Sequence, residues 1–160
     1  MKNLFISGIL AVLALFVSSC GGSGSSPSTE EPTVSKTGVF KVELTQDFIG
    51  TTADDCSMFF SFIGGDGLGN GLKDSATGKE MGSAFVLEGD DAKASRLSFE
   101  TGRGGLYIVA AVQAASISPE TGCVKVTATF YLDGRKLGTD SVVLRDGEEP
   151  VSFSTADYVS

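Results

Sequence analysis

The chain has 160 residues, of which 41% are hydrophobic, and a formal net charge of −8. This acidity excludes nucleic acid as an expected partner, because phosphate binding needs a basic surface. The sequence contains no histidine, which is both the commonest general base and the commonest metal ligand. Serine or cysteine triads are therefore not expected, and we predict no cofactor.

The first residues have the pattern of an export signal. Lys2 supplies a positive charge and the apolar run 4–17 follows it. This run is shorter than the roughly 20 apolar residues that span a bilayer as a helix, and small residues end it. Residues 17–20, Val-Ser-Ser-Cys, resemble the lipobox of bacterial lipoproteins. The resemblance implies cleavage after Ser19 and a Cys20 that carries a diacylglycerol and an N-acyl chain.

The segment after the signal favours the lipoprotein interpretation over an ordinary signal peptide that leaves Cys20 as an unmodified thiol. Residues 20–37 are rich in glycine, serine and other polar residues, so they cannot offset the entropy of ordering and should form a flexible tether. Gly21 follows the cysteine in place of the aspartate that retains enterobacterial lipoproteins in the inner membrane. The resemblance therefore implies an outer-membrane protein, facing either the periplasm or the outside.

The remaining residues, 38–160, are enough for a single domain with its own core. Short stretches of alternating apolar and polar residues, separated by turns rich in glycine and aspartate, predict β-strands. In chain order these stretches are 39–49, 56–63, 83–89, 95–101, 106–115, 123–132, 136–144 and 151–159. About eight strands at this spacing predict an all-β protein, an antiparallel sandwich or a barrel.

Two cysteines other than Cys20 open predicted strands. Cys56 begins the second strand and Cys123 begins the sixth. This placement resembles the disulfide between strands B and F of immunoglobulin-type sandwiches, although Thr121 stands where that fold has a tyrosine. The resemblance implies an Ig-like or related sandwich in which these cysteines pair. The alternative is two separate buried thiols that behave as small apolar residues.

Two of the predicted strands, 58–63 and 106–115, are apolar on both faces. A two-layer sandwich normally leaves one face of each sheet to water, so the second apolar face needs a cover. A loop or long neighbouring side chains could supply that cover. The other hypothesis is an exposed apolar patch that binds a partner.

The glycine-rich segment 64–79 is predicted to be the most mobile part of the domain and a ligand-contact loop. Its candidate contact residues are Asp66, Leu68, Asn70, Leu72 and Asp74. The spacing of its polar residues matches part of a calcium loop, but leucine and threonine occupy two of the ligand positions, so no metal site is predicted. The alternative is a passive crossover between two sheets.

Adjacent carboxylates occur as Asp54-Asp55 and Asp90-Asp91. Paired acids can share a proton in a catalytic cleft, but adjacent acids next to glycine, alanine or threonine are typical of turns, where they accept main-chain hydrogen bonds. No sequence of the G-x-S-x-G type occurs in the predicted domain. We therefore expect a protein that is not an enzyme.

The favoured function is a lipid-anchored, non-catalytic binding or structural module whose partner is a protein or a glycan. In plan it resembles the small lipoproteins of Bacteroidota, which have a lipid anchor, a linker and a β domain. One alternative is a calycin-like barrel that carries a small apolar ligand. A second is an enzyme that uses carboxylates alone.

Overall fold

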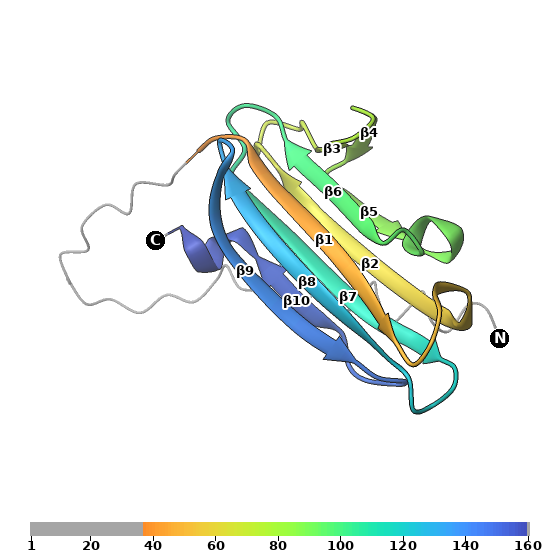
Figure 1. Ribbon diagram of the computed structural model, residues 1–160. Coiled ribbons are helices and arrows are strands. Elements are labelled where there is room, and N and C mark those ends of the chain that lie inside the picture. The colour runs from red at the N-terminus through yellow and green to blue at the C-terminus, as the bar shows by residue number, and fades with distance from the viewer. Residues whose placement is uncertain (1–36, 160) are drawn as a thin grey trace, which may run out of the picture. The chain divides into compact units, whose positions relative to one another are not determined.

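The computed structural model describes residues 37–159, which form two antiparallel sheets packed face to face (Figure 1). The six-stranded sheet has the order β4 (Glu80–Gly82), β3 (Leu72–Asp74), β6 (Arg96–Thr101), β1 (Phe40–Ile49), β8 (Cys123–Leu132) and β9 (Arg135–Leu144). The four-stranded sheet has the order β10 (Val151–Ser154), β7 (Tyr107–Ile117), β2 (Cys56–Gly65) and β5 (Ala84–Leu87). The predicted signal peptide, Cys20 and the predicted tether up to residue 36 lie outside the described residues.

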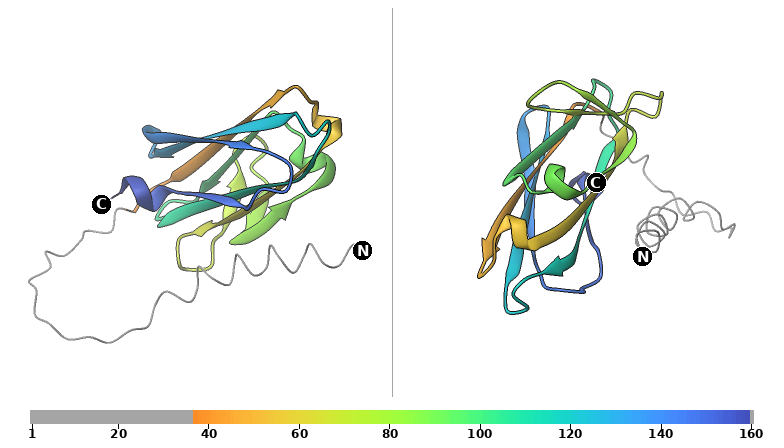
Figure 2. Two further views of the ribbon diagram at one scale, coloured as in Figure 1. Left: turned by 90° about the horizontal axis from the view of Figure 1, so that it is seen from below. Right: turned by 90° about the vertical axis from the view of Figure 1, so that its right-hand side faces the viewer.

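Alternation along the strands fills the space between the two layers, which Figure 2 shows edge-on at right. In β1, Phe40, Val42 and Leu44 are buried, whereas Lys41 and Glu43 between them face outward. The other long strands contribute their own buried residues to the same core, among them Phe60, Phe62, Ile108, Val112, Val126 and Phe130. Because each strand presents one apolar face inward, burial of that face stabilises both sheets at once.

These observations confirm the predicted all-β antiparallel sandwich. The strands form two separate sheets, with side chains packed between them, in place of the closed barrel of the calycin alternative. Consecutive strands β1 and β2 lie in different sheets, so the strand order differs from the immunoglobulin order, in which strands A and B share a sheet. The fold is thus a related sandwich. Among residues 37–159 no helix is long and apolar enough to cross a membrane.

The expected last strand, 151–159, is shorter than predicted. It ends at Ser154 and continues as a single 3₁₀ turn, η3 (Thr155–Tyr158). The Thr155 hydroxyl accepts a hydrogen bond of 2.9 Å from the N–H of Ile108, and the Ser154 hydroxyl accepts one from Ala156. Side-chain hydroxyls thus replace the next ladder bonds and turn the chain away from β7.

The two cysteines of the domain begin strands of opposite sheets, Cys56 in β2 and Cys123 in β8. Both thiols are buried and free, so the structure matches the alternative in which each behaves as a small apolar residue. The Oγ1 of Thr51 lies 3.3 Å from the sulfur of Cys56. Their disulfide pairing stays a prediction for the exported, oxidised protein.

Candidate functional site

The predicted contact loop, 64–79, is held by its own hydrogen bonds. The carboxylate of Asp66 is buried and accepts from the N–H groups of Leu68, at 2.8 Å, and Asn70, at 3.1 Å. The side-chain amide of Asn70 donates to its second oxygen. The bond from the Asn70 amide, followed by the bond from Leu68, lowers the pKa of Asp66 below its ordinary value. Asp66 is therefore an internal cap of this loop.

The structure does not bring the five predicted contact residues onto one surface. Leu72 is fully buried in the core, whereas Leu68 is 88% exposed. Leu72 begins β3 and pairs with Thr101 of β6, so the assignment of Leu72 as a contact residue is corrected. The reason is that β3 pairs with β6 and places the Leu72 side chain in the core, where removal of its apolar surface from water is favourable. Contact with a ligand through the exposed Leu68 stays a prediction.

Asp74 closes the turn that follows β3. Its Oδ1 accepts 2.8 Å hydrogen bonds from the N–H groups of Ala76 and Thr77. The bond from Thr77 is the main cause that holds the pKa of Asp74 below its ordinary value. This ordered turn forms one wall of a cleft at the edge of the six-stranded sheet.

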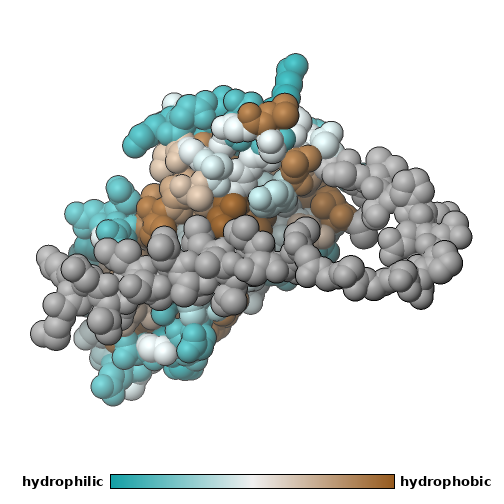
Figure 3. Space-filling model, turned by 180° about the vertical axis from the view of Figure 1, so that it is seen from behind, coloured by the Kyte–Doolittle hydropathy of each residue, from teal (hydrophilic) through white to brown (hydrophobic). Residues whose placement is uncertain are grey.

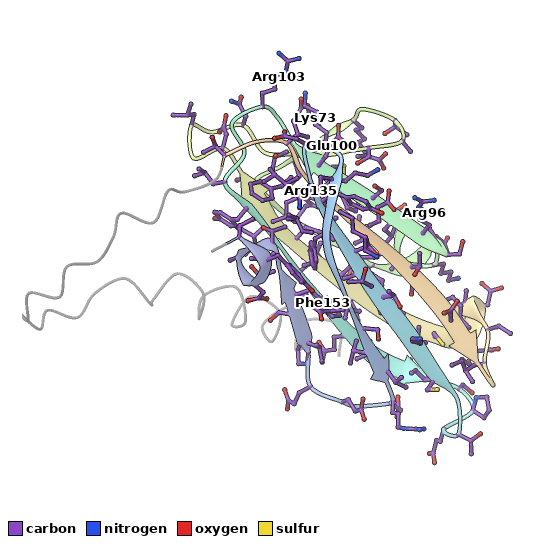
Figure 4. The ribbon with its side chains drawn as sticks, turned by 60° about the vertical axis from the view of Figure 1, so that its left-hand side comes forward. Lys73, Arg96, Glu100, Arg103, Arg135 and Phe153 are labelled. Carbon is purple, nitrogen blue, oxygen red and sulfur yellow. The ribbon has the colours of Figure 1, made fainter. Side chains whose placement is uncertain are left out.

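The cleft has a volume of about 680 Å³ and lies among the turn after β3, the strand β6 and η2 (Gly89–Ala92). Its lining carries both signs of charge, including Arg96, Lys79, Asp90 and Glu43, over an apolar floor that includes Leu97 and Phe99. Figure 4 shows Arg96 projecting outward from β6, whereas Phe153 lies between the sheets. The cleft thus combines charged, polar and apolar side chains.

Glu43 anchors the charged side chains of this cleft. Its carboxylate oxygens lie 2.6 Å from Nζ of Lys41 and 2.7 Å from Nη2 of Arg96, and it accepts from the hydroxyl of Tyr131. Burial by itself raises the pKa of Glu43, but the two cations outweigh it, so the pKa is lowered. Glu43 is therefore an ionised anchor for Arg96 and Lys41, with no proton to donate near neutral pH.

One side of β6 is only half paired. Strand β1 pairs with residues 96–100 of β6. On the other side β3 pairs only with the second half of β6 and ends at Asp74, opposite Phe99. The beginning of β6, from Arg96, therefore has no strand beside it on the side of the cleft.

The main chain of Arg96 points toward this free side. The carbonyl of Ser95 accepts from the N–H of Gln46 in β1, whereas the carbonyl of Ser98 accepts from Ser75 on the opposite side. Since main-chain groups of successive residues point to alternate sides of a strand, the N–H and C=O of Arg96 point the same way as those of Ser98. The cleft therefore contains an unpaired strand edge.

Two hydroxyl groups beside this edge also lack a partner. The side-chain oxygens of Ser75 and Ser98 are buried, and neither has a hydrogen-bond partner among the described residues. Both serines line the cleft. A buried hydroxyl without a partner is costly, so a ligand that reached these groups would gain by satisfying them.

The opposite rim of the cleft is formed by η2, which ion pairs and side-chain hydrogen bonds hold in place. Lys93 bridges Asp54, at 2.9 Å, and Asp90, at 3.0 Å. The side-chain amide of Gln46 donates 2.8 Å bonds to the carbonyls of Ala92 and Ala94.

Asp54-Asp55 and Asp90-Asp91 each belong to a single 3₁₀ turn, in agreement with their interpretation as turn residues.

Sequence reasoning did not find this cleft. Alternation along the strands could place Glu43, Arg96 and Ser98 on an outward face, but only the pairing of β6 with β1 brings them together. The early end of β3, which leaves the edge free, has no signal in the sequence that we could recognise. Within residues 37–159 no three acidic or cysteine side chains gather in a way that could hold a metal ion.

Comparison with known proteins gives similarity in structure only. The fold matches a DUF4425 family protein from Bacteroides ovatus ATCC 8483, with a TM-score of 0.59 and 18% identity over 75% of this chain and 95% of that one. It also matches a DUF4425 domain of unknown function from Bacteroides vulgatus ATCC 8482, with a TM-score of 0.62 and 22% identity over 74% and 95% of the two chains. This chain has their fold.

A third similar structure is the calcium-bound form of a protein from Parabacteroides distasonis, with a TM-score of 0.58 and 18% identity over 82% of this chain and 99% of that one. No family model and no curated protein matches the sequence. The shared fold does not by itself transfer a function.

Proposed function

We propose that this chain is a lipid-anchored binding module without catalytic activity, which takes an extended segment of a partner protein into the cleft beside β6. The observation that carries the proposal is the unpaired main-chain edge at Arg96 inside a cleft of about 680 Å³. An extended peptide can add to such an edge as a further strand. Its main-chain hydrogen bonds then supply affinity and its alternate side chains supply specificity.

The surroundings of the edge suit a peptide. Charged groups of both signs, such as Arg96 and Asp90, stand beside apolar surface from Leu97, so partner side chains of more than one kind find a complement. The unpartnered hydroxyls of Ser75 and Ser98 add two hydrogen-bonding groups at the same place.

Anchoring belongs to the same proposal. A lipidated Cys20 followed by a polar tether would hold the domain on the outer membrane while leaving the cleft free to meet its partner. Calcium forms no part of the proposal. The Asp66 carboxylate, which the calcium-loop pattern would use, already accepts three hydrogen bonds from its own loop.

The test compares two substitutions of one residue. Arg96→Ala removes the guanidinium but keeps the main-chain N–H, whereas Arg96→Pro removes the N–H as well. Proline is tolerated as the first residue of a strand, the position that Arg96 has in β6. Linear dodecapeptides are selected by phage display against the mature chain carrying Cys20→Ser, and their affinities for the three proteins are measured. We expect Arg96→Pro to weaken binding by about tenfold or more relative to Arg96→Ala, as the loss of main-chain hydrogen bonding predicts.

Thermal unfolding of both variants shows whether each still folds. A folded Arg96→Pro variant that binds the selected peptides as well as Arg96→Ala would rule out strand addition. Failure to select any peptide would count against the proposal. Binding to a glycan array would also count against it if neither substitution changed that binding, since a glycan would not need the main chain of β6.

A further inference from the structure

The strand residues on the outer face of the four-stranded sheet are all uncharged, and the exposed Glu88 directly follows β5 at the border of this face. Cross-strand neighbours share a face, and the pairs Ser61–Ala111 and Ile63–Val109 lie on the side opposite the buried Phe60 and Phe62. The same register places the following residues on this outer face: Phe59, Ser61, Ile63, Ala84, Val86, Tyr107, Val109, Ala111, Gln113, Ser152 and Ser154. We call this set the neutral face.

The neutral face is mostly apolar, and its polar residues are serines and one glutamine. Val86 is 44% exposed and Tyr107 is 41% exposed. Figure 3 views this sheet from its outer side, and the part that is visible there shows several apolar residues, with hydrophilic residues toward the ends of the molecule. By contrast, the outer face of the six-stranded sheet carries charges on neighbouring strands, such as Lys41, Glu43 and Arg96.

The net charge of the chain favours a second copy of the same chain as the partner of the neutral face. The chain has a formal net charge of −8, so two copies that approach by most of their surfaces repel each other. Across the strands of the neutral face a second copy meets no like charge. A two-fold pairing also places each apolar side chain against the same apolar patch of its partner.

The strands also favour pairing by faces over pairing by edges. The edge strands of this sheet, β5 (Ala84–Leu87) and β10 (Val151–Ser154), have four residues each, so they provide little free main chain for another strand. The central strands β2 and β7 are more than twice as long and carry most of the apolar side chains. Two such faces can stack as the sheets within a sandwich do.

We infer that the neutral face is a weak self-association surface, at which two copies of this chain pair face to face. The strand lengths and spacings give a footprint of roughly 450 Å² per copy, about half that of a standard interface. The dimer should therefore be reversible, with a dissociation constant of about 100 μM in solution.

The test uses the mature chain with Cys20→Ser and two valines of equal exposure. Val86→Glu places a charge on the neutral face, whereas Val143→Glu, on the other sheet, is the control; Val143 is 45% exposed. Sedimentation velocity from about 10 μM to about 1 mM brackets the expected dissociation constant. We expect Val86→Glu to weaken association at least tenfold and Val143→Glu to leave it unchanged. Tyr107→Glu serves as a second variant if Val86→Glu fails to fold.

Salt gives an independent readout. Because an uncharged face brings together two acidic molecules, raising the salt concentration should strengthen the dimer by screening their repulsion. A chain that stays monomeric at about 1 mM overturns the inference. A dimer that Val86→Glu does not weaken also overturns it, and so does a dimer that dissociates when salt is added. A third outcome is a chain that does not self-associate but binds vesicles of phosphatidylethanolamine and phosphatidylglycerol. If Val86→Glu abolishes that binding, the face contacts a bilayer and the inference is overturned.

Discussion

Asp66 and Asp74 stabilise the segment between β2 and β4 as ionised groups. Each accepts hydrogen bonds from main-chain N–H groups two to four residues further along, and these bonds lower the pKa of both carboxyls. Such local caps replace the ladder bonds that a turn cannot make. They explain how a segment with many glycines is ordered.

At the scale of a residue, we expect Asp66→Ala to lower the melting temperature by several degrees, because three donors lose their acceptor. Because the pKa of Asp66 is lowered in the folded protein, the ionised carboxylate stabilises the fold. This stabilisation is fully present above the ordinary pKa of aspartate, near 3.9, and it is lost as the pH falls through the lower pKa of the folded protein. The variant should therefore also lose less stability on acidification. Thermal unfolding between about pH 2 and pH 7 measures both effects. Asp47→Ala, at an exposed position on β1, is the control and should change neither.

At the scale of an element, β3 makes part of the predicted loop 64–79 into a strand of the six-stranded sheet. It has only three residues, Leu72–Asp74, yet Leu72 has no exposed surface. Pairing with β4 on one side and β6 on the other gives it ladder bonds along both edges. The end of β3 at Asp74 is also what leaves the edge of β6 open in the cleft.

Two leucines of the same segment test this assignment. Leu72→Ala should lower the free energy of unfolding by about 2–5 kcal/mol, because it leaves a cavity in the core. Leu68→Ala, at a position that is 88% exposed, should change it by no more than about 0.5 kcal/mol. Chemical denaturation of both variants gives the two values. Similar small effects would mean that β3 is a mobile appendage, as the sequence suggested.

At the scale of the whole molecule, the proposed anchor and the two described surfaces serve different contacts. The cleft lies at the edge of the six-stranded sheet, whereas the neutral face belongs to the four-stranded sheet. A partner peptide at β6 and a second copy at β2 and β7 therefore occupy different sheets. Neither proposal depends on the other, and each experiment can fail alone.

The anchor is tested by a single change, Cys20→Ser, in cells of a species that processes bacterial lipoproteins. The substitution removes the thiol that the lipobox resemblance assigns to the diacylglycerol, and so we expect the protein to move from the membrane fraction to the soluble fraction. A wild-type protein that is soluble, with an unmodified Cys20 by mass spectrometry, would contradict the assignment.

The sequence by itself determined the all-β class and most strand positions, and in an alternating strand such as β1 it also determined which residues face inward, because alternation is a local property of a strand and its turns. It also identified the two doubly apolar strands, β2 and β7, whose outer residues form the neutral face. The assignment of Asp54-Asp55 and Asp90-Asp91 to turns followed from their local neighbours in the same way.

Only the tertiary structure decided which strands are neighbours, and with that the cleft. Glu43, Arg96 and Ser75 are far apart in the sequence, and they meet because β1, β6 and the turn after β3 lie side by side. Leu72 was misplaced because a single leucine among glycines carries no periodic signal, although the core had space for it. Such long-range choices depend on the packing of the whole sandwich, where burial outweighs local preference.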